Sequence, residues 1–255
     1  MNARLARSIS MFTIIPVRVP VDLQPGDGTG ALLWLPVVGA FAGAAAALPA
    51  AAIRAWAPHA DLLGAVLAVG LLALLTRCLH LDGLADTADG LGSGAPAARA
   101  LEIMRQSDIG PFGVVALIFV LGADVAALGC LSGGPWAAVG VLAVAAATGR
   151  VAAVQAAVRG IRPARASGFG TIVADNVSAA AAVGWTVASL GLGVAVAVGL
   201  SIPVGWMLVP QVVALAVAQL LRLHAVRRLG GVTGDVFGAL IESATAVTLI
   251  GAALR

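Results

Sequence analysis

Three aspartates stand at a regular spacing in the segment HLDGLADTADG, residues 80–90. Asp82, Asp86 and Asp89 are separated by four and then three residues, so on a helix they share one face. Three carboxylates on one face repel one another unless a cation neutralises them. Because all the ligand atoms would be oxygens, magnesium is the preferred ion and manganese the alternative. The spacing predicts a metal site for a phosphorylated ligand, and a solvated acidic turn is the competing interpretation.

A second acidic segment, GGVTGDVFGALIE, occupies residues 230–242. Asp235 and Glu242 are seven residues apart and share a helix face. The glycines before Asp235 leave backbone N–H groups at a predicted helix start, where an anion binds favourably. A flexible turn has the same composition. Since both acidic segments lie at helix ends on one side of the predicted membrane topology, we expect Asp235 and Glu242 to complete the metal site.

Arginines lie beside glycines in two further segments, LEIMRQSDIGPFG at residues 101–113 and RGIRPARASGFGTIVADN at residues 159–176. The guanidinium groups of Arg105 and Arg165 match the geometry of phosphate oxygens. Orientation of the chain in a membrane would explain the same charges without catalysis. Together with the carboxylates, the arginines predict phosphoryl or nucleotidyl transfer, in which positioning and charge neutralisation provide most of the catalysis.

His80 and Asp124 each allow more than one interpretation. His80 is a candidate general base or metal ligand, and it is also a residue type that marks a helix end at the membrane interface. Asp124 lies inside a predicted span, where a carboxylate is costly and often functional. Pairing with Arg150 or protonation would equally accommodate it there.

The composition identifies the elements that must position these residues. The chain has 255 residues, of which 60% are hydrophobic and 11% charged, and its mean hydropathy is +1.03. A soluble domain of this length needs more polar surface, so we predict an integral membrane protein. Seven segments have the length and composition of membrane-spanning helices and lack the alternation of strands. They cover about residues 31–53, 62–80, 111–131, 136–158, 179–200, 203–221 and 236–254.

We therefore predict an all-α, polytopic transmembrane bundle of about seven spans, formed by a single domain over residues 1–255. Its 15 basic residues, all arginines, concentrate in alternate connections, which places the N-terminus and the motif loops 81–110, 159–178 and 222–236 in the cytoplasm. This distribution explains the net charge of +3 without a nucleic-acid partner. We expect a multi-pass protein of the bacterial cytoplasmic (inner) membrane, surrounded by the lipid bilayer, with its active site on the cytoplasmic face.

With these segments in hand, the chain resembles the cobalamin-5′-phosphate synthase (adenosylcobinamide-GDP ribazoletransferase) family. The resemblance implies a magnesium-dependent membrane enzyme that joins adenosylcobinamide-GDP, an activated corrinoid, to α-ribazole 5′-phosphate or α-ribazole. The products are adenosylcobalamin 5′-phosphate and GMP, in the last assembly step of the cobalamin nucleotide loop. The segments that carry the resemblance are FTIIPVR (12–18), LPVVGAFAG (35–43), HLDGLADTADG (80–90), LEIMRQSDIGPFG (101–113), RASGFG (165–170) and LGGVTGDVFGALIE (229–242).

In this family context the residues receive the following expected roles. Asp82 and His80 are the candidate catalytic residues, and the choice of a general base among these groups stays open. The expected magnesium ligands are Asp82, Asp86, Asp89, Asp235 and Glu242. The expected substrate-binding residues are Arg105, Arg165, Gly110, Gly113, Gly168, Thr233 and Gly234.

Two positions depart from the family pattern. Where the family usually has IMxDS, this chain has Gln106 with an acid displaced to Asp108, and Asp124 stands where a basic residue is common. The roles of these three residues stay open. So do the number of metal ions, the oligomeric state, including a homo-oligomer, and contact with other corrinoid-pathway enzymes.

Three alternatives from other classes are weaker. A CDP-alcohol phosphotransferase also uses aspartates on membrane helices, but its acids are spaced over a longer stretch. An ion-coupled transporter would place acids at the bilayer midplane, and only Asp124 fits that expectation. A structural membrane subunit would not need the segment HLDGLADTADG.

Overall fold

The computed structural model describes residues 2–19 and 27–255, and within these ranges the chain is helical with no named strand. Two isolated parallel bridges, Val158 with Val177 and Pro163 with Val232, are its only β-type pairings there. The helices in chain order are α1 (Ala3–Phe12), α2 (Asp27–Ala46), α3 (Leu48–Trp56), the 3-10 helix η1 (Pro58–Ala60), α4 (Asp61–Leu75), α5 (Leu79–Gly92), α6 (Ala97–Ile103), α7 (Pro111–Gly129), α8 (Ala137–Ala156), α9 (Phe169–Val173), α10 (Ala179–Gly199), α11 (Gly205–Leu229) and α12 (Gly234–Ala253).

Seven helical segments are long and apolar enough to cross a membrane, which confirms the predicted all-α, multi-pass bundle. The first consists of α2 and α3 together, the second of η1 and α4, and the others are α7, α8, α10, α11 and α12. Pro36 lies inside α2 and Pro210 inside α11 without ending either helix. Neighbouring helices and local adjustment satisfy the backbone groups that a proline frees.

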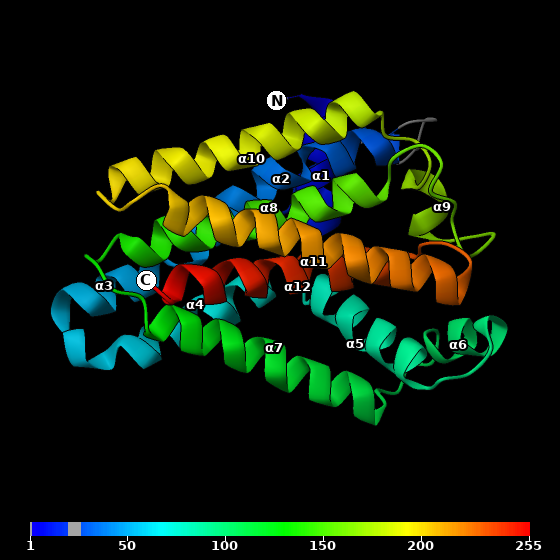
Figure 1. Cartoon of the computed structure of the whole chain (residues 1–255), viewed down its shortest axis with the longest axis horizontal. Coiled ribbons are helices and arrows are strands. Elements are labelled where there is room, and N and C mark those ends of the chain that lie inside the picture. Colours follow the sequence, from blue (N-terminus) through cyan, green and yellow to red (C-terminus); the bar gives the residue numbers. More distant parts are fainter. Residues whose placement is uncertain (1, 20–26) are drawn as a thin grey trace.

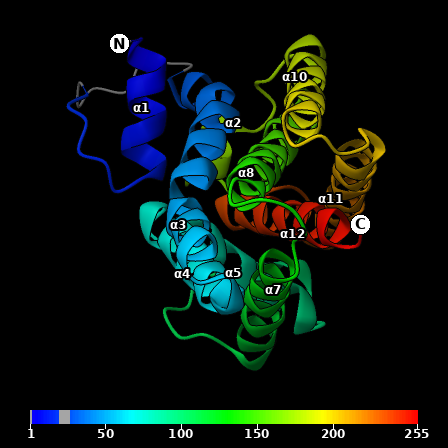
Figure 2. The ribbon, with the colours of Figure 1, turned by 90° about the vertical axis from the view of Figure 1, so that its left-hand side faces the viewer.

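Helix α8 forms the centre of the bundle. Figure 2, which looks along the bundle, shows α8 with α2, α10, α11 and α12 around it. The sequence of α8 is dominated by Ala, Val and Gly, so neighbouring backbones approach it closely. A Cβ atom added at Gly43 of α2 would lie 2.5 Å from the carbonyl oxygen of Leu142 in α8. Small residues at this contact therefore set how tightly α2 and α8 pack.

The chain breaks between α4 and α5, where the sequence predicted one span over residues 62–80. Arg77 and Cys78 both adopt a left-handed conformation with φ of 54°, and the Thr76 hydroxyl donates to the carbonyl of Leu72, at 2.9 Å. The Arg77 guanidinium donates to the carbonyl of Met11 in the α1 segment. His80 is therefore in the first turn of a new helix instead of the last turn of a span.

The polar connections are more helical than the sequence predicted. The segment 81–110 contains most of α5 and all of α6, and α11 continues to Leu229, inside the predicted loop 222–236. Figure 1 shows α6, α9 and the end of α11 at one end of the bundle, opposite α3 and the C-terminus. The motif segments that these helices carry therefore lie at one end of the bundle.

The loop before α9 is fixed to the start of α12. The backbone N–H of Ala164 donates to Val232 and that of Val232 donates to Arg162, at 2.9 and 3.0 Å. A Cβ atom at Gly231 would lie 2.4 Å from the carbonyl oxygen of Arg162, so only glycine permits this approach. The two segments RASGFG and GGVTGD are thereby held side by side.

Candidate active site

The two acidic segments meet where α5 crosses the start of α12. A Cβ atom at Gly83 would lie 2.7 Å from the carbonyl oxygen of Asp235, and one at Gly238 would lie 2.8 Å from that of His80. These glycines allow the two backbones to touch. The contact brings Asp82 and Asp86 of α5 close to Asp235 of α12, although about 150 residues separate them in sequence.

The three carboxylates repel one another. The pKa of Asp86 is raised to about 7, first by burial and then by the negative charges of Asp82 and Asp235, while Arg165 opposes the shift. Asp82 is exposed and Asp86 is half-buried. The cluster of Asp82, Asp86 and Asp235 therefore carries more negative charge than its one arginine balances, and it favours a cation.

Arg165 connects three elements at this cluster. Its Nη1 lies 3.0 Å from Oδ2 of Asp235, and its Nη2 donates to the carbonyl of Leu101 in α6, at 3.1 Å. Thr233 caps α12 by accepting the N–H of Val236, at 3.2 Å, and its hydroxyl donates to Asp235 Oδ2, also at 3.2 Å. Arg165 and Thr233 thus hold the Asp235 carboxylate in place.

Asp89 has a different set of contacts from the other two aspartates of its motif. It is 8% exposed, and its two oxygens accept the backbone N–H groups of Gly110 and Gly113, at 2.7 and 2.9 Å. Cβ atoms at these glycines would lie 2.4 and 2.5 Å from the Asp89 oxygens. Asp89, expected as a metal ligand, therefore caps the start of α7, and Gly110 and Gly113, expected to bind substrate, make room for it.

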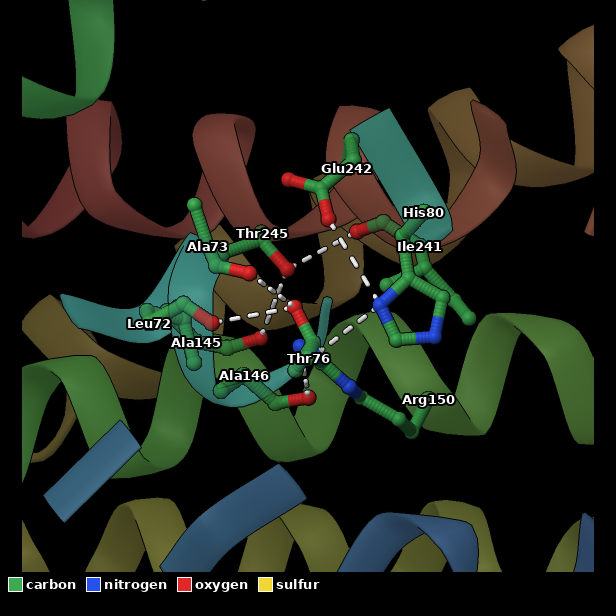
Figure 3. A network of polar contacts seen from close by, with 10 residues as sticks. All are labelled: Leu72, Ala73, Thr76, His80, Ala145, Ala146, Arg150, Ile241, Glu242 and Thr245. Atoms are coloured by element: carbon green, nitrogen blue, oxygen red, sulfur yellow. Dashed lines mark hydrogen bonds and ion pairs between the residues drawn. The ribbon is translucent and has the colours of Figure 1, made fainter. Parts of the chain in front are cut away.

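Glu242 also lies apart from the carboxylate cluster. It follows Asp235 by seven residues, about 10 Å along the helix axis, and it belongs to a buried network in the bundle interior (Figure 3). His80 Nδ1 lies 3.8 Å from Glu242 Oε1 and 3.2 Å from Arg150 Nη2. Arg150 is 1% exposed and also donates to the carbonyl of Ala146, at 3.2 Å. The structure places Glu242 with His80 and Arg150 instead of with Asp82 and Asp86.

Asp124 is buried in α7, and within the described part of the chain its Oδ1 has no hydrogen-bond partner. No ion pair joins it to Arg150 among the described residues. The sequence alternative of an Asp124–Arg150 pair is therefore not formed.

Two cavities meet at Asp82. The first, which we call the aromatic cavity, has a volume of about 360 Å³ and is lined by Phe12, His80, Phe169 and Phe237 together with Gly168, Thr233 and Gly234. The second, which we call the polar cavity, has a volume of about 400 Å³ and is lined by Asp86, Arg105, Gln106 and Asp108. Asp82 lines both cavities. Of the expected substrate-binding residues, Arg105 lines the polar cavity and Arg165, Gly168, Thr233 and Gly234 line the aromatic cavity, whereas Gly110 and Gly113 are not among the lining residues of either.

The sequence matches the family model of cobalamin-5-phosphate synthase over residues 4–253. The chain belongs to the cobalamin-5-phosphate synthase family. Curated relatives named adenosylcobinamide-GDP ribazoletransferase include a protein of Frankia casuarinae, 37% identical over 98% of this chain and 93% of its own. A relative from Bradyrhizobium diazoefficiens is 38% identical with the same coverage, and one from Klebsiella pneumoniae is 39% identical over 89% of each chain. No solved structure is significantly similar to this chain.

Of the carboxylates expected to bind a cation in this member of the cobalamin-5-phosphate synthase family, Asp82, Asp86 and Asp235 line the two cavities. Asp235 is already paired with Arg165. In the described part of the chain, no three His, Cys, Asp or Glu side chains are arranged to hold a metal ion by themselves. Mg²⁺ usually binds one or two carboxylates, retains several waters and takes its other ligands from substrate phosphates. The residues present therefore fit a magnesium ion that binds together with a pyrophosphate.

The sequence analysis assigned no role to the aromatic side chains and offered Arg150 only as a possible partner of Asp124. Phe12 and Phe169 lie within the segments FTIIPVR and RASGFG, so their position in family motifs could have indicated that they are functional. Arg150 gave a weaker signal, because an arginine in a predicted span is costly unless it has partners. Only the packed bundle identifies those partners.

Proposed function

We propose that this chain is the membrane transferase that joins adenosylcobinamide-GDP to α-ribazole 5′-phosphate, or to α-ribazole, and releases GMP. A ribose hydroxyl oxygen of the acceptor attacks the phosphorus attached to the corrinoid side chain. The bond from that phosphorus to the bridging oxygen breaks, GMP leaves with this oxygen, and the hydroxyl proton passes to the protein. The observation that carries the proposal is the carboxylate cluster of Asp82, Asp86 and Asp235 at the junction of two cavities, in a chain of this family.

Magnesium is the proposed cofactor, with manganese as a substitute. Asp82, Asp86 and Asp235 would hold it, and when bound it would neutralise the charge of the pyrophosphate. Arg165, already paired with Asp235 at 3.0 Å, contributes positive charge beside the same carboxylates. Arg105 is exposed in the polar cavity, where its guanidinium is free to bind phosphate oxygens.

Asp82 is the proposed acceptor of the hydroxyl proton. It lines both cavities, so it stands between the compartments that would hold the two reacting groups. A proton acceptor must lie within hydrogen-bond reach of the hydroxyl it deprotonates, and the position of Asp82 on the walls of both cavities supports this role.

We further propose that the end of the bundle carrying this site faces the cytoplasm, in the inner membrane. The arginine-rich connections support this orientation, and the motif segments gather at that same end (Figure 1). A reporter fused at residue 95 is expected in the cytoplasm and one fused at residue 255 in the periplasm. The reverse pattern would exclude this orientation.

The activity is tested with purified protein, adenosylcobinamide-GDP, α-ribazole phosphate and magnesium, by following GMP release and the corrinoid product. EDTA should stop the reaction, and magnesium should restore it. Asp82→Asn should abolish turnover, whereas Glu102→Gln, a change in an exposed acid paired with Arg99 at 2.7 Å, should not. No corrinoid product above the no-enzyme control would refute the proposed function.

A further inference from the structure

We propose that the aromatic cavity is the site for the flat base of the acceptor nucleoside, and that the His80 Nε2–H donates a hydrogen bond to the unprotonated ring nitrogen of this base. The inference rests on the proposed function, which requires a benzimidazole nucleoside as acceptor. It assigns the guanine nucleotide and its pyrophosphate to the polar cavity, on the other side of Asp82.

Three phenylalanines give the cavity its aromatic wall. The rings of Phe12 and Phe169 pack edge to face with centroids 5.5 Å apart, and those of Phe169 and Phe237 do so at 6.2 Å. Phe12 also stacks on the His80 ring, with centroids 6.4 Å apart and an angle of 22° between the planes. Phe12 and Phe237 are buried, while Phe169 is half-buried and borders the cavity from α9. A flat apolar ring is the ligand that such a wall accommodates.

The partners of His80 determine which of its nitrogens carries the proton. Arg150 Nη2 lies 3.2 Å from His80 Nδ1, and because a guanidinium only donates hydrogen bonds, Nδ1 must accept. The neutral imidazole then carries its proton on Nε2. In Figure 3 this second nitrogen lies across the ring from the dashed lines that join Nδ1 to Arg150 and Glu242. Among the described residues Nε2 has no hydrogen-bond partner, and the side chain is 3% exposed.

A buried donor without a partner is destabilising, so its presence at a cavity indicates a ligand that accepts a hydrogen bond. The hydroxyls of Thr171 and Thr233, which also border the aromatic cavity, are already used by Gly168 and Asp235. Asp82, Arg165, Ser167 and Asp235 also line this cavity; Asp82 and Ser167 are exposed, and Arg165 and Asp235 pair with each other at 3.0 Å. On the wall that His80 forms with the phenylalanines, the His80 Nε2–H is the donor without a partner among the described residues. A benzimidazole has one acceptor nitrogen, which would accept the hydrogen bond from His80 Nε2–H, and its other edges are apolar like the phenylalanine wall. Guanine would bury several donors and acceptors without partners there.

The size of the cavity supports the same assignment. A volume of about 360 Å³ is near the lower end of the roughly 300–1,000 Å³ typical of small-molecule sites. It accommodates a nucleoside, whereas a corrin macrocycle with its nucleotide tail is far larger. The polar cavity contains Arg105 and Asp86, groups suited to a phosphate and its cation.

The test compares Michaelis constants for the two substrates in four variants and with one altered substrate. Phe169→Leu should raise KM for α-ribazole by roughly 10-fold, as expected for loss of an aromatic contact, with KM for adenosylcobinamide-GDP unchanged. Arg105→Gln should show the opposite pattern. An α-ribazole analogue whose acceptor ring nitrogen is replaced by C–H should bind the wild type roughly 3- to 10-fold more weakly.

His80 variants separate hydrogen bonding from folding. His80→Gln keeps an N–H donor near the Nε2 position and should still distinguish α-ribazole from the C–H analogue, whereas His80→Leu should bind both equally. A rise in KM for adenosylcobinamide-GDP alone in Phe169→Leu would overturn the assignment of the cavities. Equal binding of the two acceptors by the wild type would overturn the hydrogen bond. Turnover by the wild type establishes the proposed function independently of either result.

Discussion

Replacement of Asp89 tests whether this carboxylate has a structural role that differs from the metal-binding role proposed for Asp82 and Asp86 in the same motif. Its two oxygens accept the N–H groups of Gly110 and Gly113, at 2.7 and 2.9 Å, at the start of α7. Hydrogen bonds to a charged group contribute about 1.5–3 kcal/mol each, and removal of a capping side chain costs about 0.5–2 kcal/mol. We therefore expect Asp89→Ala to lower the free energy of unfolding by about 3 kcal/mol. Asp89→Asn, which keeps one acceptor oxygen, should lower it by about half as much.

These changes are measured as thermal unfolding of the purified protein in detergent, with the magnesium dependence of turnover measured in parallel. A loss of about 3 kcal/mol corresponds to a fall in Tm of roughly 6–12 °C for a chain of this size. The magnesium concentration that gives half-maximal rate should stay the same in Asp89→Asn. Asp82→Asn is the matched control, because Asp82 is exposed; it should keep its Tm and lose turnover. An Asp89→Asn protein with unchanged Tm and a weakened magnesium response would show that Asp89 is a metal ligand after all.

Three further predictions concern neighbouring positions. Gly113→Ala should lower Tm without a selective change in either KM, because its Cβ would lie 2.5 Å from Asp89 Oδ2; a change in one KM alone would favour direct substrate binding. In EDTA-treated protein, Asp86 has a folded-state pKa of about 7, above the ordinary value of 3.8 for an aspartate, so its contribution to stability should fall as pH rises from about 4 to 7. Asp86→Asn should consequently raise Tm at pH 8 more than at pH 5. An equal rise in Tm at both pH values would show that the negative charge of Asp86 is not what destabilises the protein. Arg150→Leu should lower the free energy of unfolding by about 1–3 kcal/mol, because it leaves the buried His80 Nδ1 without its hydrogen-bond donor. Adding Glu242→Gln, which removes the negative charge that interacts with Arg150, should recover part of that loss; additive losses in the double variant would exclude coupling between the two residues.

Much of the architecture follows from local properties of the sequence. The length and apolar composition of seven segments predict the spans, because a helix is the structure that satisfies its own backbone groups in lipid. The spacing of the aspartates from Asp82 to Asp89 likewise predicts a helix with one acidic face, and α5 is helical over Leu79–Gly92. The break at Arg77 and Cys78 was not predicted, because neither residue is of a type that favours the left-handed conformation observed there.

The sequence by itself determined the membrane class, the helical content and the two acidic segments, since each depends on residues close together in the chain. Only the tertiary structure decided which carboxylates line a cavity and which are bound by other parts of the chain. The contacts at Gly83 and Gly238 fix the rotation and depth of α5 against α12, and α7 supplies the amides that engage Asp89. Positions that are equivalent on one helix face therefore have different surroundings. Asp82 lines two cavities, whereas Asp89 accepts hydrogen bonds from the start of α7. The spacing of residues within one helix cannot specify what a second helix places opposite them.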